Sequence, residues 1–401
     1  MRKKWINEES LKWVQEEIIT EEQREKIIAK YEVKDQHSLI FFFAAILIGL
    51  AFLTFVAANW QALHHLIRMG IILSFLIVFY IVGEYFYRKG KNVYSVSCFT
   101  IAILIFGAGI FLSGQMYHYS MNSVFMFFVW GLVAFLIYLS RPYQFLLIVG
   151  LVIVSIGQIY GILELSSFDW FLFSLFIIAF GGIIFIRKNA LIAWFFAISY
   201  LIQMTAFSFQ QLEDYYWLII FLLLLYNVGT FIKNEAIQRP YQSIALVAMF
   251  VITVSHALMF ESEYFRNDFY VHISYYLFLV VLLGIAILLT YNASNKLRVL
   301  QLVLFLPAFI FIEYTTFISY IILFTFSISK LVEGYQTYSQ RRVVEGTVTF
   351  LISTFLVYFQ VAWNFLDKSL FFLFGGIVLF TLGYLLEKYR RNMKSNQREG
   401  V

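Results

Sequence analysis

The stretch LIFFFAAILIGLAFLTFVAA, residues 39–58, decides the fold. It carries no charge over roughly 20 residues, the length that an α-helix needs to cross the hydrocarbon core of a bilayer. Over the whole chain, 61% of the 401 residues are hydrophobic and 13% are charged, whereas soluble domains are about half apolar and about a quarter charged. A soluble fold has no interior large enough to hide this apolar surface, so we expect the solvent to be lipid.

Similar apolar runs follow to the end of the chain. Together they predict an all-α, polytopic transmembrane helical bundle of about fourteen spans. The predicted spans are Leu39–Ala58, Leu66–Tyr87, Val93–Ser113, Met121–Leu139, Tyr143–Gly161, Phe168–Ile186, Ala190–Phe209, Tyr215–Ile232, Tyr241–Phe260, His272–Tyr291, Leu297–Ile312, Thr315–Leu331, Val343–Ala362 and Ser369–Leu386.

The lysines and arginines test this count independently, because positively charged loops tend to stay in the cytoplasm. With the N-terminus inside, 26 of the 29 Lys and Arg fall on the cytoplasmic side, and only Arg68, Arg266 and Lys368 fall outside. We therefore expect a multi-pass protein of the bacterial cytoplasmic (inner) membrane with both termini in the cytoplasm.

The segment Leu297–Leu331 admits a second interpretation, as one long helix. Every later loop would then change sides, which would leave 19 positive charges inside and 10 outside. The charge distribution favours a hairpin that turns near Glu313, with Pro307 kinking its first arm.

The first 37 residues are the one sizeable segment outside the apolar runs. Two short helices are predicted there, near Glu8–Glu17 and Glu21–Tyr31, and Thr20 with Gln23 forms a capping-box pattern before the second. We expect this helical hairpin either to pack on the cytoplasmic face of the bundle or to dock a protein partner. The predicted domains are a cytoplasmic hairpin at 1–37, a transmembrane bundle at 38–387 and a basic cytoplasmic tail at 388–401.

Several short motifs carry a resemblance to a known family. They are W-V-x-E-x-I-I-T-x-E-Q at 13–23, FVAANW at 55–60, GAG at 107–109 with GQMYH at 114–118, and SLFF at 369–372 with GG at 375–376. They resemble an uncharacterised family of bacterial multi-pass membrane proteins, domain of unknown function 2157. The resemblance implies a membrane protein and brings no catalytic residues. One departure is Glu17, where the family usually has Gly, and it puts the turn before Ile18 in doubt.

No motif for nucleotide binding, nucleophilic catalysis or zinc hydrolysis occurs in the chain. The single cysteine, Cys98, excludes an intramolecular disulfide and a cysteine-based metal site. The adjacent His64 and His65 diverge by about 100° on a helix, so they seldom share one ion. No basic stripe interleaves with aromatics, which argues against nucleic acid. We expect no cofactor and no metal, and membrane lipids as partners.

Two local patterns have structural interpretations. Glu84 lies four residues before Arg88, a spacing typical of an ion pair on one helix face. Gly157 and Gly161 form a small-xxx-small spacing, which more often packs helices than serves function.

Polar residues inside the apolar runs are the remaining clue to function. Asn59, Gln115, Gln158 and Gln203 lie within or at the end of such runs, in the half predicted to be outer. Because a polar group facing lipid is costly, we expect these side chains to face the bundle interior. The alternative is that outer residues of this kind simply sit at the level of the lipid headgroups.

The candidate site is an outward-opening polar pocket at the ends of spans one and three. Asn59 and Gln115 would hydrogen-bond a headgroup or small solute, Trp60 and Tyr117 would supply stacking area at the rim, and His118 could titrate near neutral pH. Alternatively, Asn59 and Gln115 cap their own helices, while Trp60 and Tyr117 anchor in the interface.

Three functions remain open from the sequence, and a non-enzymatic one is favoured. The first is transport or handling of a small polar solute or lipid headgroup through that outward-facing cavity. The second is a non-catalytic scaffold or sensor that acts through the N-terminal hairpin. The third is a membrane-embedded transferase on lipid-linked substrates. Polytopic glycosyltransferases that resemble that type usually carry an acidic residue in the first outer loop, whereas the loop Asn59–His65 here has no Asp or Glu.

Overall fold

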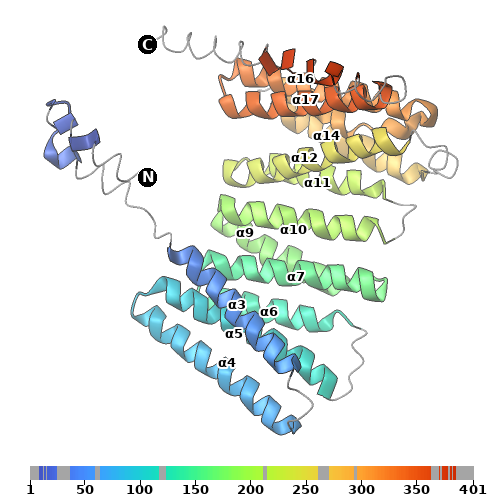
Figure 1. The fold of residues 1–401 in the computed structure, drawn as a ribbon. Coiled ribbons are helices and arrows are strands. Elements are labelled where there is room, and N and C mark those ends of the chain that lie inside the picture. The colour runs from blue at the N-terminus through green and yellow to red at the C-terminus, as the bar shows by residue number, and fades with distance from the viewer. Residues whose placement is uncertain are drawn as a thin grey trace. The chain divides into compact units, whose positions relative to one another are not determined.

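The chain folds into helices joined by short connections, as the computed structural model shows (Figure 1). The structure describes residues 9–11, 13–14, 16–24, 37–58, 64–116, 123–210, 215–260, 271–292, 296–362, 370, 373–377, 380–381 and 383–384. Within these residues there is no strand, so the predicted all-helical membrane fold is confirmed. The chain divides into two compact units, residues 1–122 with 129–150 and residues 123–128 with 151–401.

The first unit is built around α5, against which α3 and α4 both pack. Its helices are α3 (His37–Ala58), α4 (His65–Arg88) and α5 (Asn92–Met116). The next two helices, α6 (Phe125–Ser140) and α7 (Gln144–Leu165), contribute residues to both units. A core of small and branched side chains forms where α3, α4 and α5 meet, and includes Ala45, Ile72 and Ile105.

Within the second unit, helices that follow one another along the chain pack together. After the segment α8 to α9, its helices are α10 (Ala190–Ser208), α11 (Trp217–Phe231), α12 (Glu235–Met259), α14 (Ile273–Asn292), α15 (Lys296–Gln301), α16 (Thr315–Gln336) and α17 (Gln340–Ala362). Helix α12 lies at the centre, because α10, α11 and α16 all pack against it. Helices α16 and α17 form a tight hairpin.

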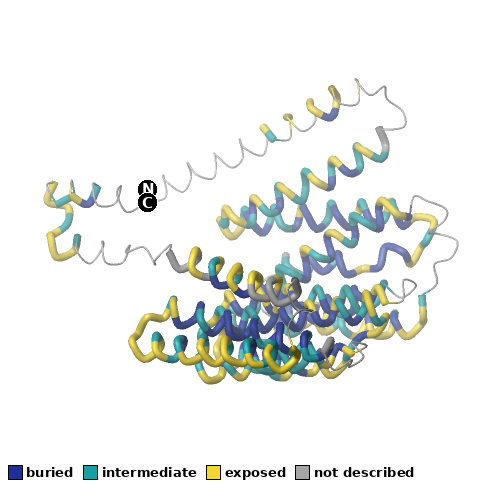
Figure 2. Tube along the Cα trace, turned by 60° about the horizontal axis from the view of Figure 1, so that its bottom comes forward, coloured by how far each residue is buried: buried dark blue, intermediate teal, exposed yellow. Residues whose placement is uncertain are grey.

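Exposed apolar side chains show that this is a membrane protein. Figure 2 shows exposed positions recurring along the helices beside buried ones. Helix α4 has only Ile72 and Gly83 buried, and its Leu66 and Ile81 are 66% and 60% exposed. Within the described ranges, nine helices are long and apolar enough to cross a membrane. The total of fourteen spans stays a prediction, since two further apolar helices are shorter and the last predicted span is only partly described.

The described part of the N-terminal segment confirms the predicted capping box. The Thr20 N–H donates to Gln23 Oε1 at 3.0 Å, and the Gln23 N–H donates to Thr20 Oγ1 at 3.2 Å. The first helix ends before Glu17, which has a φ of 56°. The Ile18 N–H donates to Trp13 O and the Glu17 N–H to Val14 O, the bonds of a Schellman turn. A left-handed position of this kind favours glycine, the residue usual in the resembled family.

The sixth predicted span is a helix with an irregular centre. It consists of α8 (Trp170–Leu175), one π-helical turn (Phe176–Gly181) and α9 (Gly182–Arg187). Asp169 caps it, because its Oδ1 accepts from the Leu172 N–H at 2.7 Å. The π turn was not predicted, since hydropathy does not report how many residues make one turn.

The prediction of a helix over Leu297–Ile312 is wrong for most of that span. Only α15 is α-helical there, and three short 3₁₀ turns follow, at Leu302–Phe305, Ala308–Ile310 and Ile312–Tyr314. We call Leu302–Tyr314 the irregular arm. The two ends of this arm still lie at opposite ends of α16. At its start, Arg298 of the preceding α15 contacts Glu333 near the end of α16. At its other end, Tyr314 directly precedes Thr315, the first residue of α16. The chain therefore reverses near Glu313, as the charge distribution predicted.

Buried aromatic packing holds the irregular arm in place. Phe309 is 1% exposed, and its ring centroid lies 5.6 Å from that of His256 and 5.9 Å from that of Tyr275. The side chains of Leu304 and Phe305 are fully buried. Pro307 has no backbone N–H and prevents a continuous helix, and the arm instead forms 3₁₀ bonds such as Ile310 N–H to Pro307 O at 3.2 Å.

Candidate functional site

The residues predicted for the outer pocket fall almost entirely outside the described ranges. Asn59, Trp60, Tyr117 and His118 lie outside them, and of Gln115 only its place in α5 is described. Their pocket therefore stays a prediction.

Two other polar residues face the interior as predicted. Gln158 and Gln203 are fully buried. The Gln158 amide donates to Asp169 O at 3.0 Å and accepts from the Asp169 N–H at 3.3 Å, so it fixes the residue that caps α8. These contacts give Gln158 a structural role.

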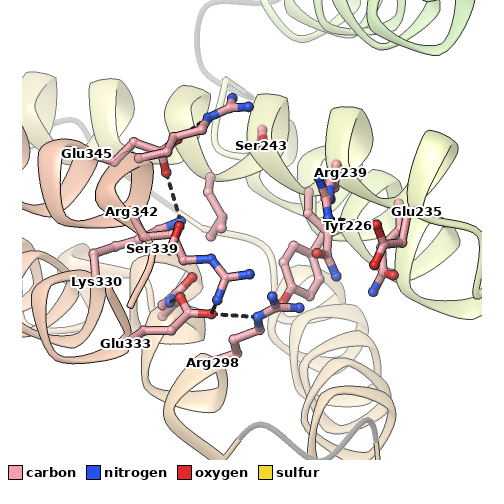
Figure 3. A pocket seen from close by; sticks show the side chains of 15 residues that line it. Tyr226, Glu235, Arg239, Ser243, Arg298, Lys330, Glu333, Ser339, Arg342 and Glu345 are labelled. Atoms are coloured by element: carbon pink, nitrogen blue, oxygen red, sulfur yellow. Dashed lines mark hydrogen bonds and ion pairs between the residues drawn. The ribbon is translucent and has the colours of Figure 1, made fainter. Parts of the chain in front are cut away.

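The structure contains a polar cavity in the second unit that the sequence did not predict. Its volume is about 230 Å³, and it opens among the ends of α11, α12, α15, α16 and α17 (Figure 3). Its lining is almost entirely polar or charged. The lining residues are Tyr226, Glu235, Gln238, Arg239, Gln242, Ser243, Leu246, Arg298, Gln301, Lys330, Glu333, Ser339, Arg341, Arg342 and Glu345.

A buried carboxylate, Glu333, organises the cavity. Its side chain is 2% exposed, and its Oε1 accepts a hydrogen bond from Arg298 Nε at 2.8 Å and forms an ion pair with Arg342 Nη1 at 2.9 Å. Its Oε2 accepts from Gln301 Nε2 at 2.7 Å. The two guanidinium groups converge on this carboxylate (Figure 3). A buried charge of this kind is tolerated only when paired and hydrogen-bonded, and Glu333 has both.

The hairpin between α16 and α17 brings Arg342 to Glu333. Helix α16 closes with a second Schellman turn, in which Tyr338 has a φ of 50° and the Ser339 N–H donates to Gly334 O at 3.0 Å. Gly334 allows the close approach, because a Cβ there would lie 2.6 Å from the backbone nitrogen of Val343. The first turn of α17 therefore places Arg342 beside the last turn of α16.

The short helix α15 supplies the other two partners of Glu333. Arg298 and Gln301 are three residues apart and therefore share one face of that helix. Both contact the same carboxylate, one through each oxygen. Because α15 is separated from α16 by the irregular arm, this contact also fixes where the arm begins.

A second set of charges lines the cavity around Glu345. Arg341 Nε lies 2.9 Å and Lys330 Nζ 3.7 Å from Glu345 carboxylate oxygens. The side chain of Lys330 is only 17% exposed, although Glu345 is 42% exposed. On the α12 wall, Arg239 pairs with Glu235 at 2.6 Å, and both are largely exposed.

The charge of the cavity favours an anion. Five cationic side chains and three carboxylates line it, which leaves a formal excess of two positive charges. Arginine donors in a partly dehydrated cleft bind carboxylates and phosphates strongly, because their planar forks match those groups. The lining consists mainly of charged groups and hydrogen-bond donors, so the arrangement is suited to binding.

The first unit holds a similar but separate cluster of charges. Glu84 accepts from Arg88 Nε at 3.0 Å, which confirms the predicted pair. It also accepts from Arg141 Nη2 at 2.6 Å, a partner 57 residues away that sequence spacing could not reveal. The Arg141 guanidinium lies 4.2 Å from the ring centroid of Tyr87. Glu84 has the same two-arginine environment as Glu333 and provides a matched control.

The small-xxx-small pattern packs helices, as predicted. A Cβ on Gly157 would lie 2.5 Å from Phe127 Cβ, and one on Gly161 would lie 2.8 Å from Val124 Cγ2. Helix α7 therefore packs closely against the start of α6 at these positions.

Comparison with known proteins identifies the N-terminal third of the chain. Residues 11–147 match the family model described as "Predicted membrane protein (DUF2157)". No curated protein and no solved structure matches the chain significantly. The matched segment includes α3 to α6 and the first turn of α7, whereas the cavity around Glu333 lies beyond it. Residues 11–147 of the chain are therefore similar to DUF2157, a family of predicted membrane proteins.

Proposed function

We propose that the protein binds a small polar solute or a lipid headgroup for transport or handling, and that the binding site is the cavity around Glu333. We further propose that it lies in the cytoplasmic (inner) membrane with both termini in the cytoplasm. On that topology the cavity opens to the cytoplasm, since its lining residues belong to loops and helix ends that are rich in Lys and Arg.

One observation carries this proposal: a nearly fully buried glutamate organises a cavity with excess positive charge. A buried charge is costly unless it is paired, and clusters of such charges in a cleft are candidate ligand sites. Five elements spread between Trp217 and Ala362 meet there. A purely structural ion pair needs no open cavity, whereas a ligand site does.

Two of the functions left open by the sequence compete with this one. A scaffold or sensor would act through residues 1–37, and its function would not require the cavity to be occupied. A transferase would need a base beside its nucleophile, whereas each carboxylate that lines the cavity is paired with an arginine.

The experiment uses single-cysteine variants, which are simple to make because Cys98 is the one cysteine in the chain. In a Cys98→Ser background, Ser243→Cys places a thiol on the cavity wall. Ser140→Cys is the control, since Ser140 is exposed at the end of α6 and does not line the cavity. Both are labelled with a membrane-impermeant maleimide in cells and in inverted vesicles.

We expect both thiols to react only in inverted vesicles, where the cytoplasmic face is accessible. The labelling of the cysteine at 243 is then measured with phosphate, sulfate, choline, glucose or dihexanoyl phosphatidylglycerol present. Slower labelling at 243 but not at 140 supports a binding cavity. Unchanged labelling with every probe, together with loss of cellular function on deletion of residues 1–37, would favour the scaffold.

A further inference from the structure

The cavity chemistry narrows the ligand beyond a polar solute. We infer that the cavity around Glu333 is a phosphate site, which takes a phosphate group from either a lipid headgroup or a free phosphate compound. This inference rests on the proposed function, because it names the ligand class of the same site.

Glu333 holds the arginines of the cavity in place. Its two oxygens accept hydrogen bonds from Arg298 and Gln301 at 2.7–2.8 Å, and Oε1 also forms an ion pair with Arg342 at 2.9 Å. It therefore serves as an internal anion that holds two guanidinium groups in fixed positions at the cavity wall. Fixing the arginines in advance reduces the ordering cost of binding, which is how preorganised sites gain affinity.

Arg298 and Arg342 keep hydrogen-bond donors that face the cavity. Glu333 is contacted through Arg298 Nε and Arg342 Nη1, and a guanidinium carries five N–H groups on three nitrogens. Each arginine therefore retains donors beyond those bonds. Their side chains are 30% and 28% exposed, so these donors reach the cavity without being fully hydrated.

Lys330 supplies a further positive charge. Its Nζ lies 3.7 Å from Glu345, too far for a strong hydrogen bond. The side chain is nevertheless mostly buried. An ammonium held in this way beside two guanidinium groups binds a group with several charged oxygens, and a phosphate offers such a group in a compact volume.

The charge and polarity of the lining exclude other ligand classes. A cation would meet a formal excess of two positive charges, and an apolar ligand would meet a lining with Leu246 as its only aliphatic side chain. The cavity of about 230 Å³ accommodates a phosphate with a short substituent. Basic pockets between transmembrane helices at the cytoplasmic side are the places where proteins bind anionic lipid headgroups.

The test uses the purified full-length protein in detergent and has two arms. The first arm measures thermal unfolding and labelling at Ser243→Cys with inorganic phosphate against chloride at matched ionic strength. The second arm measures binding of phosphatidic acid against diacylglycerol with the same acyl chains, by native mass spectrometry. The two lipids differ only in the phosphate.

We expect phosphatidic acid to bind and diacylglycerol not to bind. If inorganic phosphate also stabilises the protein and slows labelling, a free phosphate compound is the ligand; if only the lipid binds, the headgroup is. Arg298→Gln or Arg342→Gln is expected to weaken binding about tenfold, the loss of one charge-assisted hydrogen bond at a partly exposed site. Arg141→Gln, in the matched cluster of the first unit, leaves it unchanged.

Lys330→Gln guards against loss of folding in the arginine variants, because Lys330 does not support Glu333 by a short contact. We expect it to weaken binding while gel filtration and tryptophan fluorescence stay unchanged. Equal binding of both lipids, with phosphate acting like chloride, overturns the inference. If choline or glucose then protects the thiol at 243, the proposed function survives that failure; if no probe does, both fail.

Discussion

The close approach of α16 and α17 yields a prediction with opposite signs at two glycines. In Gly334→Ala, the new Cβ would lie 2.6 Å from Val343 N, 2.8 Å from Val343 Cγ2 and 3.0 Å from Arg342 C. Ordinary contact begins near 3.4 Å, so the α17 backbone would have to move by about 0.8 Å. The matched control is Gly284→Ala in α14, where a Cβ meets nothing within 4 Å.

The magnitudes follow from two competing effects. Replacing a helical glycine with alanine stabilises a helix by about 1 kcal/mol, and this gain applies to both variants. Overpacking against a backbone that cannot rotate away costs about 1–3 kcal/mol, and this cost applies only at Gly334. We therefore expect Gly334→Ala to lower the free energy of unfolding by up to about 2 kcal/mol, and Gly284→Ala to raise it by up to about 1 kcal/mol.

The free energies are measured by titrating the detergent-purified variants with dodecyl sulfate and following tryptophan fluorescence. Gly346→Ala should behave like Gly334→Ala, because its Cβ would lie 2.7 Å from Leu331 N. A gain in stability for Gly334→Ala equal to that for Gly284→Ala would refute the reasoning, since it would mean that the two helices are not in backbone contact.

Three further predictions test other parts of the structure. Glu333→Gln should lower the free energy of unfolding by about 2–3 kcal/mol, because two charge-assisted hydrogen bonds are weakened while the part-exposed arginines regain water. The same dodecyl sulfate titration should show a smaller loss for Glu84→Gln, whose side chain is 21% exposed. Glu17→Gly should slow amide exchange in the peptide that contains Ile18 about fivefold, because glycine adopts the φ of 56° without strain; unchanged exchange would mean that the turn does not limit opening. Reporter fusions after Asn234 and after Arg391 should both read cytoplasmic, and an extracytoplasmic signal at Arg391 would contradict the reversal near Glu313.

Local features were predictable from the sequence because their partners lie a few residues apart. The capping box of Thr20 and Gln23 and the pair of Glu84 with Arg88 both follow from helix spacing. Most of the described helices in the apolar runs also agree with the predicted spans to within a few residues, apart from the irregular arm, the start of α12 and the end of α16. Hydropathy reports the membrane directly, so these runs needed no tertiary information.

The cavity was not predictable, because many of its lining residues lie on polar helix ends beyond the apolar runs. Helix α12 begins at Glu235 and not at Tyr241, and α16 continues to Gln336 and not only to Leu331. Helix α17 begins at Gln340, three residues before the predicted start. These extensions carry Arg239, Glu333 and Arg342. Hydropathy marks where the membrane is and not where a helix ends, and contacts across 35 residues, such as Arg298 with Glu333, depend on the tertiary fold.

The length of the irregular arm sets the position of α15 along the axis of α16 in the second unit. A 3₁₀ helix rises about 2.0 Å per residue and an α-helix about 1.5 Å, so the ten 3₁₀ residues between Leu302 and Tyr314 alone would be about 5 Å shorter in α-helical form. That difference is about one α-helical turn. Because Tyr314 is joined directly to α16, the shortening would draw α15 along the axis of α16 and carry Arg298 past Glu333. The axial length of this segment, and not its sequence alone, therefore determines which residues of α15 and α16 stand opposite each other.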